Sequence, residues 1–180
     1  MRAYTCREVL GDYPIWCVPD DLVHITVETD ASAPSTDISP AERTRLIAAL
    51  KARLTRFEPI TVLCGSPLAN RTGAVLDTHP DQGLVALRNL VRAALWEVHD
   101  TSAIAHGGGR GHASLGYAYD GADSDPLQSA LRRISPSHAP LTVSQLHLLD
   151  VCWTAHPSPD GGVRWEMSWE PVARIPLGGG

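Results

Sequence analysis

Apolar residues along this chain of 180 residues recur at a period of two in some stretches and at a period of three to four in others. The first period is typical of strands and the second of helices. The first half has the order strand, strand, helix, strand, strand, and the second half has strand, helix, strand, strand. This repeated order predicts an α+β fold of two pseudo-symmetric lobes around a central groove, each an antiparallel sheet with helices on its outer face.

Turn and capping signals give the bounds of the expected elements. Ser39, Pro40 and Glu42 form a capping-box pattern with proline at the first helical position, and apolar residues at helical spacing follow as far as Phe57. The strands are expected at residues 13–18, 22–28, 60–64, 73–78, 112–119, 141–153 and 163–172, with the first two paired as a hairpin. One domain is expected, with lobe one over about 1–80, a bridging helix over about 81–99 and lobe two over about 100–180.

Composition limits the classes of function. The net charge of −5 and the isoelectric point near 5.9 argue against a protein that holds long nucleic acid by neutralising phosphates, because that mode needs a positive face. A small phosphorylated ligand or a short RNA end is compatible with this charge. No stretch approaches the roughly 18 apolar residues of a membrane span, so a cytoplasmic protein with no membrane partner is expected.

One tripeptide type occurs at the same point of both repeats. Residues 24–26 are His-Ile-Thr and residues 112–114 are His-Ala-Ser, each within an expected strand. Because side chains in a strand alternate between its two faces, the first and third residues of each tripeptide point the same way. If the lobes pack with approximate two-fold symmetry, two imidazoles and two hydroxyls meet across the groove.

Two histidines with two hydroxyls suit the cleavage of a phosphodiester. His24 or His112, when neutral, can take a proton from an attacking water while the other, protonated, donates one to the leaving oxygen. The hydroxyls of Thr26 and Ser114 can donate hydrogen bonds to the non-bridging oxygens as charge builds up on them. This chemistry requires no metal and no cofactor. Arg110, two residues before the second histidine, is a candidate phosphate contact.

The paired motifs resemble the signature of the 2H phosphoesterase superfamily, the 2'-5' RNA ligase and cyclic phosphodiesterase group. That family carries one H-x-T/S motif in each of two pseudo-symmetric lobes, and the resemblance covers most of this chain. It implies a phosphoric diester hydrolase acting on a 2',3'-cyclic phosphate or a 2'-5' linkage, with the catalytic roles at His24, Thr26, His112 and Ser114. The implied partner is a nucleotide or a short RNA end and not DNA, and a monomer is favoured. The segment before the second motif, HGGGRG, lacks the proline often found there in the family.

Two other classes of function stay open. A binding module would keep the groove and recognise a nucleotide or an RNA end without turnover. A structural domain whose two motifs arose by chance would leave the two histidines far apart. The run His106–Gly109 is similar to the oxyanion loop of lipases, but the G-x-S-x-G nucleophile elbow of those enzymes is missing from the sequence. The glycines are expected to let the chain turn into the second motif or to bring backbone amides near an anion.

The remaining candidates are expected to be structural. Tyr117 and Tyr119 alternate onto the face opposite His112, which favours core packing unless the strand has a bulge. Trp165 and Trp169 share one face of the last strand and are also expected in the core. Buried structural thiols are expected for Cys6, Cys17, Cys64 and Cys152. The spacing of His79, His99, His106 and His112 fits no known metal-site pattern.

Overall fold

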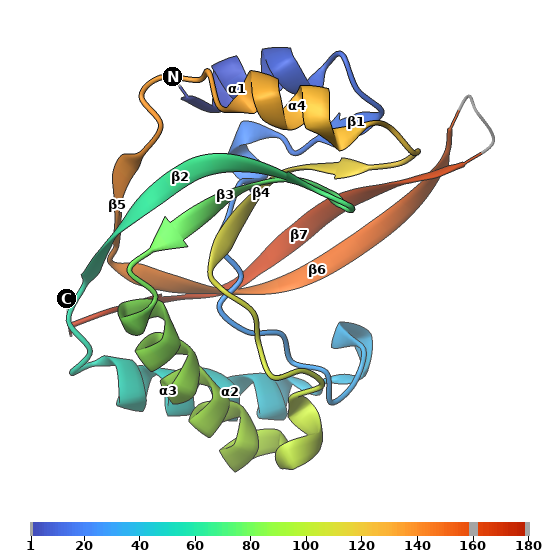
Figure 1. Cartoon of the computed structure of the whole chain (residues 1–180). Coiled ribbons are helices and arrows are strands. Elements are labelled where there is room, and N and C mark those ends of the chain that lie inside the picture. The colour runs from blue at the N-terminus through green and yellow to red at the C-terminus, as the bar shows by residue number, and fades with distance from the viewer. Residues whose placement is uncertain (1, 159–161, 179–180) are drawn as a thin grey trace.

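Two lobes, each a sheet with a pair of helices on its outer side, make up the computed structural model, which describes residues 2–158 and 162–178 (Figure 1). The sheet lobe contains a five-stranded antiparallel sheet in the order β1-β4-β3-β2-β5, covered by α1 and α4. The ribbon lobe contains the two-stranded antiparallel ribbon β6–β7, covered by α2 and α3. The expected α+β class is therefore confirmed. The bounds are α1 Arg2–Leu10, β1 Ile15–Cys17, α2 Pro40–Leu54, β2 Ile60–Asn70, β3 Gly73–His79, α3 Gln82–His99, β4 His112–Ala118, α4 Ser124–Leu131, β5 Ala139–Val143, β6 Gln145–Pro157 and β7 Val163–Pro176.

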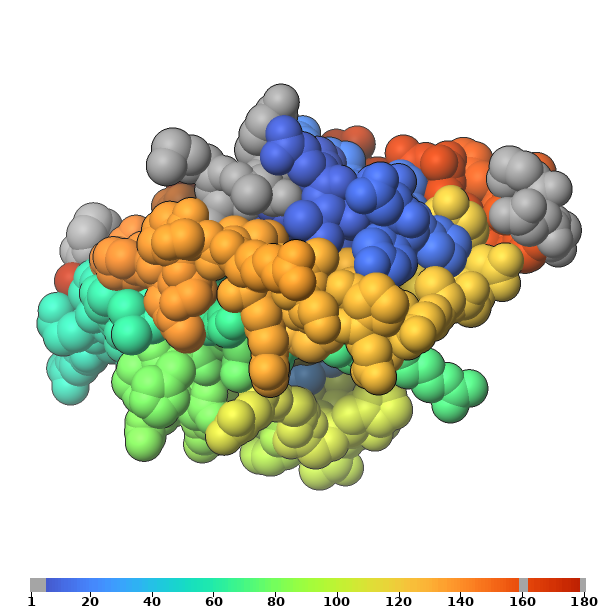
Figure 2. Space-filling model, turned by 45° about the horizontal axis from the view of Figure 1, so that its top comes forward, coloured from blue at the N-terminus to red at the C-terminus, as the bar shows by residue number. Residues whose placement is uncertain are grey.

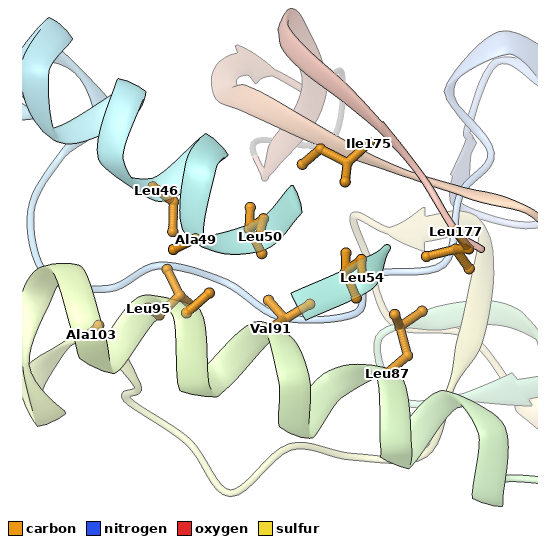
Figure 3. Packing of buried hydrophobic residues seen from close by; sticks show 11 residues of the cluster. Leu46, Ala49, Leu50, Leu54, Leu87, Val91, Leu95, Ala103, Ile175 and Leu177 are labelled. Atoms are coloured by element: carbon orange, nitrogen blue, oxygen red, sulfur yellow. The ribbon is translucent and has the colours of Figure 1, made fainter. Parts of the chain in front are cut away.

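The helix α2 begins where the capping box predicts. The Ser39 hydroxyl accepts a hydrogen bond from the Glu42 backbone N–H, and the Glu42 carboxylate accepts one from the Ser39 N–H at 2.9 Å. The buried side chains of α2 face those of α3, and Ile175 and Leu177 near the end of the chain close the cluster (Figure 3). The cluster of buried residues in the ribbon lobe is Leu46, Ala49, Leu50, Leu54, Leu87, Val91, Ala94, Leu95, Ala103, Ile175 and Leu177.

The core of the sheet lobe lies between α1, α4 and one face of the sheet. Cys6 and Leu10 of α1 and Leu127 and Leu131 of α4 pack against the buried residues of β3 and β4. The helix α1 was not expected from the sequence, because residues 2–10 carry no N-cap signal and only a short run of apolar positions. No helix in the described part of the chain is long and apolar enough to span a membrane.

The two lobes do not correspond to the two halves of the chain, so the expectation that each half builds its own sheet is wrong. The strand β4, from the second half, lies between β1 and β3 of the first half, and β5 pairs with β2. The ribbon lobe takes its helices from the first half and its strands from the second. The expected strand at 141–153 is divided at Ser144 between β5 and β6, because the backbone carbonyl there accepts a hydrogen bond from Leu177 at 2.9 Å and the chain passes into the ribbon.

The expected hairpin of residues 13–18 with 22–28 is also wrong. The strand β1 pairs with β4, and residues 22–28 contribute one bridge to the same edge of β4, after a 3-10 turn over Asp20–Leu22. Arg7 of α1 stabilises the turn between β1 and residues 22–28, because it donates hydrogen bonds to the Val18 carbonyl at 2.7 Å and to the Asp20 carboxylate at 2.5 Å. The first histidine tripeptide therefore lies beside the strand that carries the second one.

Candidate active site

The two histidine tripeptides are neighbours in space. An antiparallel bridge joins their middle residues, Ile25 and Ala113, whose side chains belong to the core under α1 and α4. In an antiparallel pair the residues that flank a bridge stand opposite each other. The first residue of each tripeptide therefore stands opposite the third residue of the other, and all four of these side chains point away from the core.

His24 thus stands opposite Ser114, and Thr26 stands opposite His112. Directly opposed Cβ atoms in such a pair lie about 5 Å apart and diagonal ones about 7–8 Å apart. The two histidines are therefore a diagonal pair on one face. The hypothesis that the motifs arose by chance predicted two distant histidines, and this prediction is wrong.

Both ring nitrogens of His24 are engaged. Its Nδ1 lies 2.8 Å from the Leu22 carbonyl oxygen, and its Nε2 lies 3.1 Å from the Thr26 hydroxyl. Because a carbonyl oxygen only accepts hydrogen bonds, Nδ1 carries the proton in the neutral ring and Nε2 is the unprotonated nitrogen. The ring also meets Trp169 of β7 edge to face, with the ring centroids 5.1 Å apart, which fixes its orientation.

His112 has the same tautomer with fewer contacts. Its Nδ1 lies 3.0 Å from the Arg110 carbonyl oxygen, so its Nε2 is again the unprotonated nitrogen of the neutral ring. Within the described residues no hydrogen-bond partner faces this Nε2, and the side chain is exposed. Asp77 of β3, which the sequence did not single out, is the residue directly opposite His112 on the other edge of β4.

Arg88 of α3 joins the first motif to the loop that precedes the second. Its Nε donates to the Val27 carbonyl at 2.9 Å, and its Nη1 donates to the Gly109 carbonyl at 2.6 Å. Val27 directly follows the His-x-Thr tripeptide, and Gly109 lies three residues before His112. The helix expected to bridge the two halves therefore holds both motif segments in place.

Arg92, one helical turn further along α3, makes a parallel pair of contacts. Its Nε donates to the Glu28 carboxylate at 2.5 Å, and its Nη2 donates to the His106 carbonyl at 2.9 Å. This ion pair is largely shielded from water, with 15% of the arginine side chain and 11% of the glutamate side chain exposed. Neither arginine was identified from the sequence, although their spacing of four residues puts them on one face of the predicted helix.

Gly111 fixes the start of β4. Its carbonyl accepts a hydrogen bond of 2.6 Å from the buried Thr78 hydroxyl. A Cβ atom at this position would lie 2.5 Å from a methyl group of Leu84 and 2.7 Å from that hydroxyl. The close packing of this glycine positions His112 without the proline found in the family motif.

Arg110 presents its backbone to the site and its side chain to solvent. The guanidinium is 75% exposed and its Nε lies 3.2 Å from the carboxylate of Asp81, just before α3. Its carbonyl is the partner of His112 described above. Among the described residues no group of three or more His, Cys, Asp and Glu side chains gathers as a metal site would require.

A bulge in β4 brings an aromatic side chain to the histidine face. Ser114 pairs with Val75 of β3 and Gly116 pairs with Ala74, so Leu115 is the extra residue. Beyond the bulge the alternation is reversed, and Tyr117 shares the face of Ser114. It stacks on Trp16 of β1 at 6.3 Å between ring centroids. The core packing expected for Tyr117 is therefore wrong, because the strand does have a bulge.

The ribbon brings further aromatic residues to the same region. Trp153 of β6 meets Tyr117 edge to face at 5.3 Å between ring centroids. The core position expected for Trp165 is wrong, and so is the burial expected for Cys152, because both residues are exposed and none of the described helices covers this part of the ribbon (Figure 1). Trp169 is half-buried against His24. Figure 2 shows a recess in the surface between the orange α4 region and the yellow-green segment after α3, with a blue early segment at its floor.

The fold matches several solved structures over nearly the whole chain. TT0787 of Thermus thermophilus is 18% identical with a TM-score of 0.64, and the match covers 99% of this chain and 92% of that chain. A phosphoesterase is 14% identical with a TM-score of 0.60, over 97% of this chain and 92% of that chain. LigT of E. coli is 13% identical with a TM-score of 0.58, over 97% of this chain and 90% of that chain.

These three proteins belong to the 2H phosphoesterase superfamily. LigT has also been crystallised with 3'-AMP, with NADP+ and with ATP. No family model and no curated protein matches the sequence. The resemblance that the two motifs predicted is thus confirmed at the level of the fold.

Proposed function

We propose that the protein is a metal-independent phosphodiesterase that hydrolyses a 2',3'-cyclic phosphate or a 2'-5' phosphodiester of RNA or of a nucleotide. The observation that carries this proposal is the Ile25–Ala113 bridge, because it sets two histidines and two hydroxyls on one face as neighbours, which supports their acting on one phosphate. The shared fold with LigT and other phosphoesterases supports the same reaction class.

In the proposed reaction, one neutral imidazole removes a proton from water through its Nε2, and the water oxygen bonds to phosphorus. The bond from phosphorus to one ribose oxygen breaks, and the other histidine, protonated on Nε2, donates its proton to that oxygen. A cyclic phosphate then becomes a phosphomonoester with a free ribose hydroxyl. Since His24 and His112 both have Nδ1 tied to a carbonyl, each presents the nitrogen that this exchange requires.

Thr26 and Ser114 hold the non-bridging oxygens in this proposal, where negative charge grows in the transition state. Arg110 adds a further phosphate contact, because among the described residues Asp81 alone pairs with its exposed guanidinium and an incoming phosphate competes for it. Nucleotides are the expected ligand class, and the crystallisation of LigT with 3'-AMP and ATP supports this assignment.

Phosphorus NMR of the purified protein with 2',3'-cyclic nucleotides and with short RNAs that end in a cyclic phosphate tests the proposal. The expected result is conversion to a phosphomonoester that is undiminished in EDTA and lost in His24→Ala and in His112→Ala. His138→Ala is the matched control, because that histidine is exposed and contacts only its neighbour Ser137 among the described residues.

Saturable nucleotide binding with no product after long incubation would contradict hydrolysis and support the binding module instead. Turnover that survives the double replacement of His24 and His112 would overturn the mechanism. The chemical shift of the product shows which ribose oxygen leaves, because the 2'- and 3'-phosphomonoesters are distinct species.

A further inference from the structure

One face of the ribbon carries most of its aromatic side chains. In the β6–β7 register Val151 pairs with Trp169, Trp153 with Met167 and Ala155 with Trp165. Because opposed residues of an antiparallel pair point to the same side, these six side chains share one face. We call this set, together with Val163, the aromatic face.

Much of the aromatic face is in contact with water. The exposed fractions are 45% for Val151, 44% for Trp153, 50% for Val163 and 51% for Trp165. Burying a tryptophan is among the largest favourable terms available to a fold, so two half-exposed tryptophans on one face are informative. Exposed apolar patches of this kind mark binding surfaces more often than scattered single residues do.

The aromatic face is continuous with the candidate active site. Trp169 touches the ring of His24, and Trp153 touches Tyr117, which lies on the histidine face of β4. Trp165 lies four residues from Trp169 along β7, a distance of about 13 Å. A ligand that begins at the histidines and reaches Trp165 is therefore longer than one nucleoside.

No charged residue of Val151–Pro157 or Val163–Trp169 lies on the aromatic face, so stacking suits this face better than phosphate neutralisation. Asp150 pairs with Glu170 and Thr154 pairs with Glu166, so all three carboxylates alternate onto the face opposite the tryptophans. With a net charge of −5 the protein offers little general attraction for a polyanion. Aromatic side chains bind successive bases of a single strand whatever the overall charge, because every base has a π-face.

We infer that the aromatic face binds the unpaired bases of a single-stranded RNA end whose terminal phosphate lies between the two histidines. This inference rests on the proposed function and narrows its substrate to an oligonucleotide, in preference to a mononucleotide. A second copy of the chain fits less well: two half-exposed tryptophans offer on the order of 100 Å² each, far below the roughly 800 Å² per partner of a stable interface.

Binding of oligoadenylates of one to four nucleotides, each with a 3'-phosphate and a fluorescent label, tests the inference without relying on turnover. The expected result is that affinity rises with length, by about five-fold or more for a base that reaches Trp165. Trp165→Ala is expected to remove this gain and to leave mononucleotide binding unchanged. Trp165→Phe, which keeps an aromatic ring, is expected to retain part of the gain.

Two controls separate stacking from other causes. Trp96→Ala removes a similarly exposed tryptophan on α3, in the ribbon lobe but outside the aromatic face, and is expected to keep the full length dependence. Oligonucleotides whose additional units are abasic keep the phosphates and lose the bases, so they are expected to bind no better than the mononucleotide.

Equal affinity for all lengths would overturn the inference, as would an equal gain from abasic units. A dimer in sedimentation that Trp165→Ala dissociates would overturn it by assigning the face to a second copy. Turnover without length dependence contradicts this inference alone, whereas length-dependent binding without turnover contradicts the proposed hydrolysis and supports the recognition of an RNA end.

Discussion

The segment around His24 and the strand that begins at His112 present the same chemical groups from very different supports. Residues 22–28 make one backbone bridge to the sheet, whereas His112 starts the seven-residue strand β4, which is paired on both edges. Side chains of the first segment are also divided between two cores: Ile25 packs in the sheet lobe and Val27 in the ribbon lobe.

This difference shows how the site depends on the contact between the lobes. Ala113 and Leu115 belong to the core of the sheet lobe, so that core orients the strand that carries His112. Leu84 and Arg88 of α3 contact the residues just before this strand. His24 is oriented by a segment that passes from one core to the other and by Trp169 from the ribbon. A change in the packing of the lobes should therefore move the first histidine relative to the second.

The largest expected effect comes from the histidines themselves. His24→Ala and His112→Ala should each lower kcat/KM by roughly 10²–10⁴-fold, as is typical for the loss of a general acid or base. The wild-type rate should have a bell-shaped dependence on pH, because one ring must be neutral and the other protonated. The pH profile of each variant's residual activity should lack one limb of the bell. The missing limb then shows whether the replaced histidine is the base or the acid.

Two variants that lose the same limb would contradict the division of roles between the histidines. If only one of the two variants loses a limb of the pH profile, the two histidines differ in chemical role as well as in structural support. The histidine whose replacement leaves both limbs in place would then serve only to bind phosphate.

The next effect tests the link between the lobes. The ion pair of Arg92 with Glu28 is largely buried, so Arg92→Ala leaves a shielded carboxylate without its partner and should cost about 3–5 kcal/mol of unfolding free energy. Glu97→Gln, which removes the partner of Arg53 in a more exposed ion pair, should cost about 0–1 kcal/mol. Urea denaturation measures both values.

At a temperature where the Arg92→Ala variant is still fully folded, its kcat/KM should nevertheless be lower than that of the wild type. A double variant with Glu28→Gln should recover part of the stability, because the buried charge is then gone. Equal losses of unfolding free energy in Arg92→Ala and in Glu97→Gln would show that the Arg92–Glu28 ion pair does not hold the first motif segment.

A smaller effect should come from Gly111, on the side of the second histidine. A methyl group there meets Leu84 and the Thr78 hydroxyl at less than 3 Å, so Gly111→Ala should cost about 1–3 kcal/mol and lower kcat. Gly107→Ala is the matched control, because a Cβ atom at that position meets nothing within 4 Å. Comparable losses from both substitutions would contradict the positioning role of Gly111.

The local elements were predictable from the sequence where one strong signal controls them. The capping box at Ser39 predicted the start of α2, and the alternation around each histidine predicted which side chains share a face. These signals depend on neighbours in the chain, so tertiary contacts do not alter them.

The arrangement of the elements was not predictable in the same way, because it depends on contacts between distant segments. One extra residue at Leu115 reverses the face of Tyr117, and no local pattern marks that bulge. No sequence pattern singled out Arg88 and Arg92, because their partners are carbonyls and a carboxylate of two distant segments. The sequence predicted one lobe for each half of the chain, because the order of elements along the chain does not reveal that β4 inserts between β1 and β3.

The smallest effect should come from the cap of α2, the helix whose core supports the Val27 end of the first motif segment. Ser39→Ala removes the hydroxyl that accepts from the Glu42 N–H and should cost about 1 kcal/mol of unfolding free energy in urea denaturation near neutral pH.

Hydrogen bonds from the side chain and backbone of Ser39 hold the pKa of Glu42 below its usual range. A lowered carboxyl pKa contributes stability that is complete above the usual glutamate range and is lost as the pH falls through the lowered value. The difference between wild type and Ser39→Ala should therefore shrink in acid, while Ser137→Ala, outside any helix cap, should show no such dependence. A cost that stays constant from neutral pH into acid would mean that the charge of Glu42 takes no part in the cap. The contribution of α2 to the support of His24 would then come from its apolar contacts alone.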